Sequence, residues 1–283
     1  MLKSMANSYT GLRAHQQMLD VTAHNLANVN TVAYKERLVS FQELLYRNLA
    51  ERRLPVAGEA PLPPRGGRGV ALAGTVPSSR EGSLNFTGKQ FDLALAGEGF
   101  FRVVRPDGSY AYTRSGNFGL DAEGRLVTAG GDRLDFTLNL PATEKIEPFD
   151  PVITPQGEIY IQASSPIEKK EGESPVPEEN EGEQSAPGLK VGEIFLYRFT
   201  NPQGLSSVGE NLLLPSANSG PPQEGKAGEN GFGLIQQGFL ESSNVDLAGQ
   251  MVKLIRGQRA LQASIRTLTA ADELWAQTLN LQI

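Results

Sequence analysis

The chain has 283 residues, a formal net charge of −6 and no cysteine. The absence of cysteine excludes disulfides and thiolate metal sites, and the acidic balance argues against a general nucleic-acid-binding protein, which needs a basic face. No stretch approaches the ~18 apolar residues of a transmembrane helix, so we expect no membrane insertion. The opening MLKSMANSYTGL has no apolar run like that of a secretory signal, so export of this chain would need another route.

The first predicted element is an assembly helix over residues 1–30. Its seam positions are spaced alternately three and four residues apart, and they are Leu2, Met5, Tyr9, Leu12, Gln16, Leu19, Ala23 and Leu26. This period of about 3.5 residues is typical of a coiled-coil seam. The polar stretch NLANVNTVAYK, residues 25–35, predicts the helix end, because Asn and Thr side chains compete for nearby backbone groups. Asn28 also tolerates the left-handed conformation that a helix end needs.

Residues 31–90 are interpreted as a turn and an extended arm, with Pro and Gly concentrated in residues 51–80. Residues 91–215 predict a central antiparallel β domain, because short alternating runs are separated by turn signals. The strand candidates are Phe100–Val104, Tyr110–Thr113, Gly124–Thr128, Glu158–Gln162, Glu193–Phe199 and Asn211–Leu214.

Within that domain, the run from Glu193 to Phe199 places two sets of side chains on opposite faces of a strand. Ile194 and Leu196 form one set, and Phe195, Tyr197 and Phe199 form the other. Residues 167–188 are acidic and rich in Pro and Gly, which predicts a solvated, mobile insertion. Residues 216–242 are expected to form a return loop.

The last predicted element is a second assembly helix over residues 243–283. Its seam again alternates four and three residues and consists of Leu247, Met251, Leu254, Gln258, Leu261, Ile265, Leu268, Asp272, Trp275 and Leu279. Ser243 with Asp246 resembles a capping box at its start.

These elements predict an α+β protein whose N- and C-terminal coiled-coil helices pack together beside the β domain. Ordering a residue costs about 1–2 kcal/mol of backbone entropy, and burying a Leu returns about 1.5–3 kcal/mol. Only about two residues in seven lie on each seam, so contacts outside each helix must supply the remaining stability. The polar seam residues Gln16, Gln258 and Asp272 would fix the register.

Sites for chemistry are sparse. His15 and His24 are nine residues apart on the first helix, so they cannot share a metal as an i, i+4 pair does, and we interpret them as solvated or interface residues. No carboxylate cluster has ligand spacing, no Gly-x-Ser-x-Gly elbow occurs, and the glycine-rich residues 65–69 lack the Walker lysine. We therefore predict no catalytic residue, no cofactor and no metal, and interpret Trp275 as a packing residue.

Three segments, in order along the chain, resemble the bacterial flagellar rod and hook proteins. They are NLANVNTVAYK, the central LALAGEGFFRVVRPDGSYAYTRSGNFGLDAEGRLVTAGG over residues 93–131, and GFLESSNVDLAGQMVKLIRGQRALQASIRTL over residues 238–268. The signature turn of the family falls on Asn25, Leu26, Ala27, Asn28, Asn30, Thr31 and Lys35.

The resemblance implies a structural, non-enzymatic subunit of the flagellar basal body. Family members assemble into a helical tube whose terminal helices line the inside, and which transmits torque and serves as an export channel. The implied partners are copies of the chain, homologous rod and hook proteins and the flagellar type III export apparatus, and also the surrounding ring proteins and peptidoglycan. The expected location is therefore extracytoplasmic, in the basal body. Residues 67–95 favour the distal-rod branch, while the proximal-rod and hook branches stay open.

The expected assembly interface consists of the larger seam side chains: Leu2, Met5, Tyr9, Leu12, Leu19, Leu26, Leu247, Met251, Leu254, Leu261, Ile265, Leu268, Trp275 and Leu279. An alternative from another class is a glycan-binding or glycan-cleaving β domain that dimerises through its helices. The sequence carries no paired carboxylates beside an obvious cleft signature, which disfavours the cleaving form.

Overall fold

A computed structural model describes residues 2–44, 47–48, 65–67, 69–122, 124–138, 151–161 and 189–280. The predicted insertion at 167–188 lies outside these residues. The chain divides into two compact units. One unit comprises Met1–Arg80 with Ser243–Ile283, and the other comprises Glu81–Ser242.

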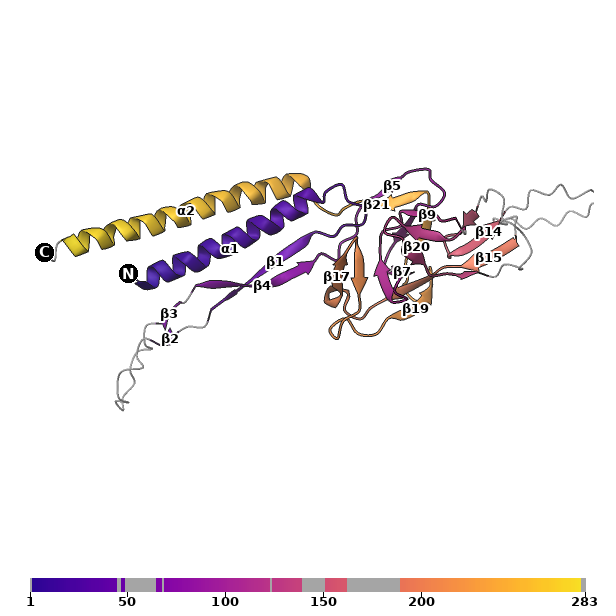
Figure 1. Ribbon diagram of the computed structural model, residues 1–283, viewed down its shortest axis with the longest axis horizontal. Helices are drawn as coiled ribbons and strands as arrows, with labels where there is room; N and C mark the ends of the chain where they lie inside the picture. Colours follow the sequence, from indigo (N-terminus) through magenta and orange to yellow (C-terminus); the bar gives the residue numbers. More distant parts are fainter. Residues whose placement is uncertain are drawn as a thin grey trace, which may run out of the picture. The chain divides into compact units, whose positions relative to one another are not determined.

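The first unit contains two long helices and a β ribbon. Helix α1 (Leu2–Ala27) lies between helix α2 (Leu247–Asn280) and the ribbon of β1 (Arg37–Glu43) and β4 (Val70–Pro77), and the two helices run in opposite directions (Figure 1). The pairing of β1 with β4 is antiparallel, and β2 (Arg47–Asn48) pairs in the same sense with β3 (Arg65–Gly66). The segment expected as an extended arm thus folds back on itself.

Glycines allow close approach on both sides of α1. A Cβ atom on Gly257 of α2 would lie 2.7 Å from Cδ2 of Leu19 and 3.0 Å from Cε of Met18. At Gly69 the backbone φ is +95°, and a Cβ atom there would lie 2.0 Å from Oγ1 of Thr10, which is too close for two atoms that are not bonded. Small residues at these two positions therefore set how closely α1 packs against its neighbours.

The second unit is built from antiparallel strands. Its largest sheet has the order β17-β18-β8-β7-β11-β10-β9, with β16 pairing both β7 and β19, and a four-stranded sheet has the order β12-β15-β14-β13. Two further pairs are β20 with β6 and β21 with β5. The strands are β5 (Leu84–Phe86), β6 (Leu93–Ala96), β7 (Phe100–Val104), β8 (Tyr110–Thr113), β9 (Phe118–Leu120), β10 (Leu126–Thr128), β11 (Arg133–Leu134), β12 (Thr137–Leu138), β13 (Pro151–Ile153), β14 (Glu158–Ile161), β15 (Leu189–Glu193), β16 (Phe195–Arg198), β17 (Ser206–Gly209), β18 (Leu212–Leu214), β19 (Gln223–Lys226), β20 (Leu234–Gln237) and β21 (Phe239–Glu241), with a 3-10 turn at Pro202–Gly204.

The core lies on both faces of β16, as the alternation in its sequence predicts. Ile194 and Leu196 are completely buried in one cluster, which is centred on Phe101. Tyr197 and Phe199 are buried in a second cluster, where the ring of Tyr112 meets both of them edge to face. The period-2 prediction for this run is confirmed.

Several strands of the second unit lie outside the runs predicted as strands. The predictions for β7 and β8 coincide with the structure, whereas residues 216–242, expected to be a return loop, contain β19, β20 and β21. The residues of β19, Gln-Glu-Gly-Lys, are mostly exposed and show no apolar alternation. This strand forms because its backbone pairs with β16, which a local pattern does not reveal.

Candidate assembly site

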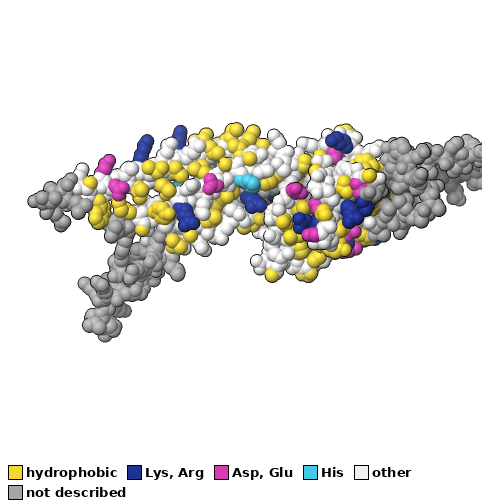
Figure 2. Space-filling view, viewed as in Figure 1, with side chains coloured by type: hydrophobic (Ala, Val, Ile, Leu, Met, Phe, Trp, Pro, Cys, Tyr) yellow, Lys and Arg dark blue, Asp and Glu magenta, His cyan; other side chains and the backbone are white. Residues whose placement is uncertain are grey.

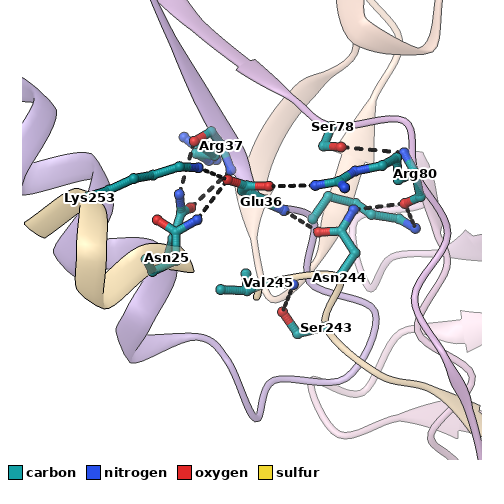
Figure 3. A network of polar contacts seen from close by, with 11 residues as sticks. Asn25, Glu36, Arg37, Ser78, Arg80, Ser243, Asn244, Val245 and Lys253 are labelled. Atoms are coloured by element: carbon teal, nitrogen blue, oxygen red, sulfur yellow. Dashed lines mark hydrogen bonds and ion pairs between the residues drawn. The ribbon is translucent and has the colours of Figure 1, made fainter. Parts of the chain in front are cut away.

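The polar turn after α1 is organised by Asn25, which is itself inside the helix and only 2% exposed. Its Nδ2 donates to the carbonyl of Arg37 at 2.9 Å, and its Oδ1 accepts from the Arg37 N–H at 2.9 Å (Figure 3). The same Oδ1 also accepts from the Tyr34 hydroxyl at 2.9 Å. A buried side-chain amide thus makes the bonds that a neighbouring strand would make. Asn25 therefore fixes the start of β1 against α1, rather than ending the helix.

The helix end itself depends on Asn28. Its Nδ2 donates to the carbonyl of His24 at 2.9 Å, which also accepts from the Asn28 N–H at 3.2 Å, and its Oδ1 accepts from the Thr31 hydroxyl at 3.1 Å. Asn28 does not use the left-handed conformation that it tolerates: the residue with positive φ in this turn is Ala33, at +56°. Because Asn28 satisfies the helix end through its side chain, the backbone reversal falls five residues later.

Glu36 is the centre of a buried polar cluster in the first unit. Its Oε1 accepts from Nε2 of Gln250 at 2.7 Å and from Nζ of Lys253 at 2.7 Å, and its Oε2 accepts from Nη2 of Arg80 at 3.1 Å (Figure 3). The side chain of Glu36 is 3% exposed. One carboxylate therefore joins α2 to the segments that precede β1 and follow β4.

The surroundings of Glu36 favour its charged form. Burial raises the pKa of this carboxyl, but the hydrogen bonds from Lys253 and Gln250 and the positive charges of Lys253 and Arg80 lower it by more. The pKa of Glu36 consequently lies below its ordinary value. A buried charge with this many partners costs little while the cluster is complete and much when one partner is missing.

Asn244 completes the cluster near the point where the chain re-enters the first unit. Its Oδ1 accepts from the Glu36 N–H at 2.6 Å, and its Nδ2 donates to the carbonyl of Arg80 at 2.7 Å (Figure 3). The signature residue Lys35 donates to the same carbonyl at 2.9 Å. The sequence motifs around residues 25–35 and 243–245 therefore meet at one place.

Helix α2 begins later than the capping-box prediction places it. Asp246 is the cap, because its Oδ1 accepts from the Ala248 N–H at 3.1 Å and its carbonyl accepts from Gln250 N at 2.9 Å. The hydroxyl of Ser243 instead accepts from Val245 N at 3.3 Å (Figure 3). The predicted capping box is wrong by three residues, since Asp246 takes the position given to Ser243.

The predicted seam of α2 divides into two rows. Leu254, Leu261, Leu268 and Trp275 are half-buried and lie on the row that also carries the four small or polar residues Gln250, Gly257, Ser264 and Ala271. That row faces α1, as the contact of Gly257 with Leu19 shows. Leu247, Met251, Gln258, Ile265 and Asp272 lie on the other row and are exposed. A single heptad seam therefore does not describe α2.

The predicted seam of α1 divides in the same way. Met5, Leu12, Leu19 and Leu26 are half-buried, whereas Tyr9, Gln16 and Ala23 are exposed, with Tyr9 61% exposed. Leu2 and Leu279 belong to the helices, but their side chains lie outside the described part. The remaining signature residues are Ala27 and Asn30, which are exposed, and Thr31, which is half-buried.

Sequence reasoning missed Glu36, Gln250 and Lys253. Gln250 lies on the row of α2 that repeats every seven residues but belongs to no predicted seam. Glu36 carries no local signal beyond its place just after the polar turn. Gln250 and Lys253 are three residues apart on α2, which puts them on one side of that helix. Only the folded chain brings this side to Glu36.

Other kinds of site find little support among the described residues. They hold no group of His, Asp and Glu side chains suited to a metal ion, and His24 meets the ring of Tyr34 edge to face. Neither described helix is long and apolar enough to cross a membrane. A cavity of about 310 Å³ in the second unit is lined by Phe86, Gly88, Lys89, Gln90, Pro151, Val152, Gln237 and Gly238, with no carboxylate among these residues.

Three family descriptions match the chain. Residues 5–35 match the flagella basal body rod protein family, residues 94–161 match the flagellar hook protein FlgE/F/G D1 domain, and residues 236–281 match the flagellar basal body rod FlgEFG protein C-terminal family. The first match covers α1 from residue 5 onward, and the last match contains α2 with Asn244, Gln250 and Lys253, whereas Glu36 and Arg80 lie outside both matches.

Full-length relatives agree with these matches. The flagellar basal-body rod protein FlgG of Borreliella burgdorferi is 33% identical over 100% of this chain and 99% of its own length. The chain belongs to the flagellar rod and hook protein family. A second member of this family, FlgG of Bacillus subtilis, is 33% identical over the whole of both chains, and the flagellar hook-basal body complex protein FlhP of the same organism is 29% identical over 97% of each.

Membership in the flagellar rod and hook family gives the chain its role and place. It is a structural subunit of the bacterial flagellar basal-body rod and is located in the basal body.

Proposed function

We propose that this chain forms the distal part of the flagellar rod as a helical tube of many copies. In this tube the paired helices of each copy make the inner layer and the β unit lies outside. The tube transmits motor torque and encloses the channel through which later subunits are exported. The proposal includes no catalytic step.

The observation that carries the proposal is the incomplete burial of the helix seams. Leu12, Leu19, Leu26, Leu254 and Leu261 are only half-buried although α1 and α2 already pack together. Leucine side chains gain about 1.5–3 kcal/mol from complete burial. Contacts with further copies would supply that burial, and contacts that do not close on themselves produce a filament.

The distal position rests on the relatives named FlgG and on the resemblance of residues 67–95. Because the relative named FlhP is a hook-basal body complex protein, a proximal-rod or hook position is the second candidate for this chain. Export would use the flagellar type III apparatus. Ring proteins and peptidoglycan around the rod are further proposed partners.

Truncation tests the proposal directly. Deleting residues 1–30 or residues 245–283 should abolish polymer formation in electron micrographs of concentrated protein. The second unit, Glu81–Ser242, is compact by itself, so circular dichroism should still show a cooperative β-sheet transition. A truncated chain that polymerises like the intact one contradicts the proposal.

A further inference from the structure

The cavity of the second unit lies beside an aromatic ring that the fold leaves uncovered. The side chain of Phe86 is 74% exposed, the largest exposed fraction among the large hydrophobic residues of the described chain. The ring of Phe239 holds it in place edge to face, with centroids 5.2 Å apart. Cβ atoms on Gly88 and Gly238 would lie 3.7 Å and 3.4 Å from ring atoms of Phe86, and because both residues are glycines these contacts are not made. Phe86 therefore offers a flat apolar platform to a ligand.

The strand edge at this cavity is already hydrogen-bonded. Strand β13 is the last strand of its sheet, and Gln237 occupies its outer side. Nε2 of Gln237 donates to the carbonyl of Pro151 at 2.7 Å, and Oε1 of Gln237 accepts from the Ile153 N–H at 3.0 Å. An extended peptide could not add a strand to this edge without displacing Gln237. The cavity thus suits a ligand that binds through its own faces and substituents, not through a peptide backbone.

The charge of the cavity is local. Lys89, which is exposed, is the one charged residue among the eight that line it. Elsewhere on the visible face of the second unit, acidic and basic side chains lie close to one another (Figure 2). This mixture gives no general attraction for an anionic polymer. A single cation beside an aromatic platform instead favours a ligand that combines an apolar ring face with a carboxylate.

We propose that this cavity binds a peptidoglycan strand, with a sugar ring lying on Phe86 and a carboxylate of the peptide stem reaching Lys89. The C–H face of a sugar ring is apolar, whereas its hydroxyl groups remain in water, which matches a platform that is open to solvent. The cavity volume of about 310 Å³ is at the lower end of the range for small-ligand sites and fits a short part of such a strand. This inference rests on the proposed function, in which the β unit lies outside the tube and peptidoglycan is a partner.

Sedimentation with purified peptidoglycan sacculi tests the platform. The full chain is used at concentrations at which it does not sediment alone, and the bound fraction is measured over a series of sacculus concentrations. Phe86→Ala should weaken binding by about tenfold, because the sugar ring loses the apolar surface on which it lies. Leu120→Ala is the matched control, since Leu120 is an exposed apolar residue of β9 outside the cavity. That variant should bind within about twofold of the wild type.

A second comparison tests the cation. Lys89→Gln should weaken binding to intact sacculi by about threefold or more. Arg133→Gln, which removes an exposed cation of β11 outside the cavity, should not. Sacculi whose peptide stems have been removed by an amidase keep their sugars but lose the stem carboxylates. The wild type should bind these sacculi more weakly than intact ones, and Lys89→Gln should bind them as well as the wild type does.

The outcomes separate this inference from the proposed tube. All four variants should unfold at the wild-type temperature, because the substituted side chains are exposed. A wild-type chain that does not sediment with sacculi overturns the inference, as does a Phe86→Ala variant that binds like the wild type or no better a binder in Leu120→Ala. Polymer formation is followed separately, in electron micrographs of concentrated protein without sacculi. A chain that binds sacculi but never polymerises overturns the tube and not the glycan site.

Discussion

Asn25 holds both backbone polar groups of Arg37, donating to its carbonyl and accepting from its N–H, each at 2.9 Å. A single buried amide in the helix thereby replaces a pairing strand at the beginning of β1. The relationship explains why an asparagine stands two residues before the helix end, where helix propensity alone disfavours it.

Replacing Asn25 should therefore destabilise the first unit. Asn25→Ala leaves the N–H and the carbonyl of Arg37 and the hydroxyl of Tyr34 without these partners, at about 1–3 kcal/mol for each group that stays buried. We expect a loss of about 2–4 kcal/mol in the free energy of unfolding, measured by urea denaturation. Asn30→Ala, at an exposed position of the same turn, should change it by less than about 0.5 kcal/mol. Equal effects of the two variants contradict this role.

Glu36 should make the first unit sensitive to acid. The pKa of Glu36 is lower in the folded chain than the ordinary value of 4.5, so the folded chain favours the deprotonated carboxylate more than the unfolded chain does. The resulting stability is complete above about pH 4.5 and is lost as the pH falls through the lower folded pKa. Urea unfolding followed from pH 7 to pH 3 should show this loss in the wild type.

Glu36→Gln supplies the comparison for that measurement. The variant should be less stable than the wild type at pH 7, because Lys253 and Arg80 lose their anionic partner. The difference between the two proteins should shrink as the pH falls from 4.5 to the lower folded pKa of Glu36, because the unfolded wild-type chain takes up the proton first and the folded carboxyl follows. A difference that stays constant over this range shows that the charge of Glu36 does not stabilise the fold.

Close packing of the helices should depend on Gly257. Gly257→Leu places a side chain where Leu19 and Met18 already lie, and overpacking of this kind costs about 1–3 kcal/mol. Gly11→Ala is a control on the other helix, because a Cβ at Gly11 meets no atom within 4 Å. That variant should gain up to about 1 kcal/mol from helix propensity. Thermal unfolding followed by circular dichroism at 222 nm distinguishes the two variants. A Gly257→Leu variant that unfolds at the wild-type temperature would contradict the close packing of Gly257 against Leu19 and Met18.

Leu261 should be required both for the helix pair and for assembly. Leu261→Asp introduces a charge into the half-buried row that faces α1, so polymers should not form even at high protein concentration. Leu19→Asp should act in the same way from α1. Asp substitution at the exposed Ala263 is the control, and electron microscopy of the three proteins is the measurement. Normal polymers of Leu261→Asp contradict the seam.

Hydrogen exchange of the dilute monomer should be graded along the helices. The Glu36 cluster and the Asn25 bonds anchor residues 19–27 and 247–257, whereas residues 2–9 are held by a longer hydrogen bond, from Nδ2 of Asn7 to the carbonyl of Gly67 at 3.3 Å. Amides toward residues 2–9 and 268–280 should therefore exchange fastest, and those of β7 and β8 slowest. Uniformly slow exchange along both helices would show that the helices are fully ordered before assembly.

The sequence by itself determined the two terminal helices, the β-rich middle of the chain and the family, because each depends on a periodicity or a motif that a linear chain displays. The heptad spacing around Leu19 and Leu261 and the alternation from Ile194 to Phe199 are signals of this kind. The start of α2 was misplaced because Ser243 and Asp246 both suit a helix cap, and only the backbone geometry chooses between them.

Tertiary structure alone decided which half of each seam is used within the chain. Periodicity places Met251 and Leu254 in one stripe, but a helix of finite width presents one row to α1 and leaves the other exposed. The structure also decided the Glu36 cluster, whose members are more than 200 residues apart at its extremes. A carboxylate becomes the centre of such a cluster through burial and through the arrival of distant donors, and neither is encoded in its local sequence.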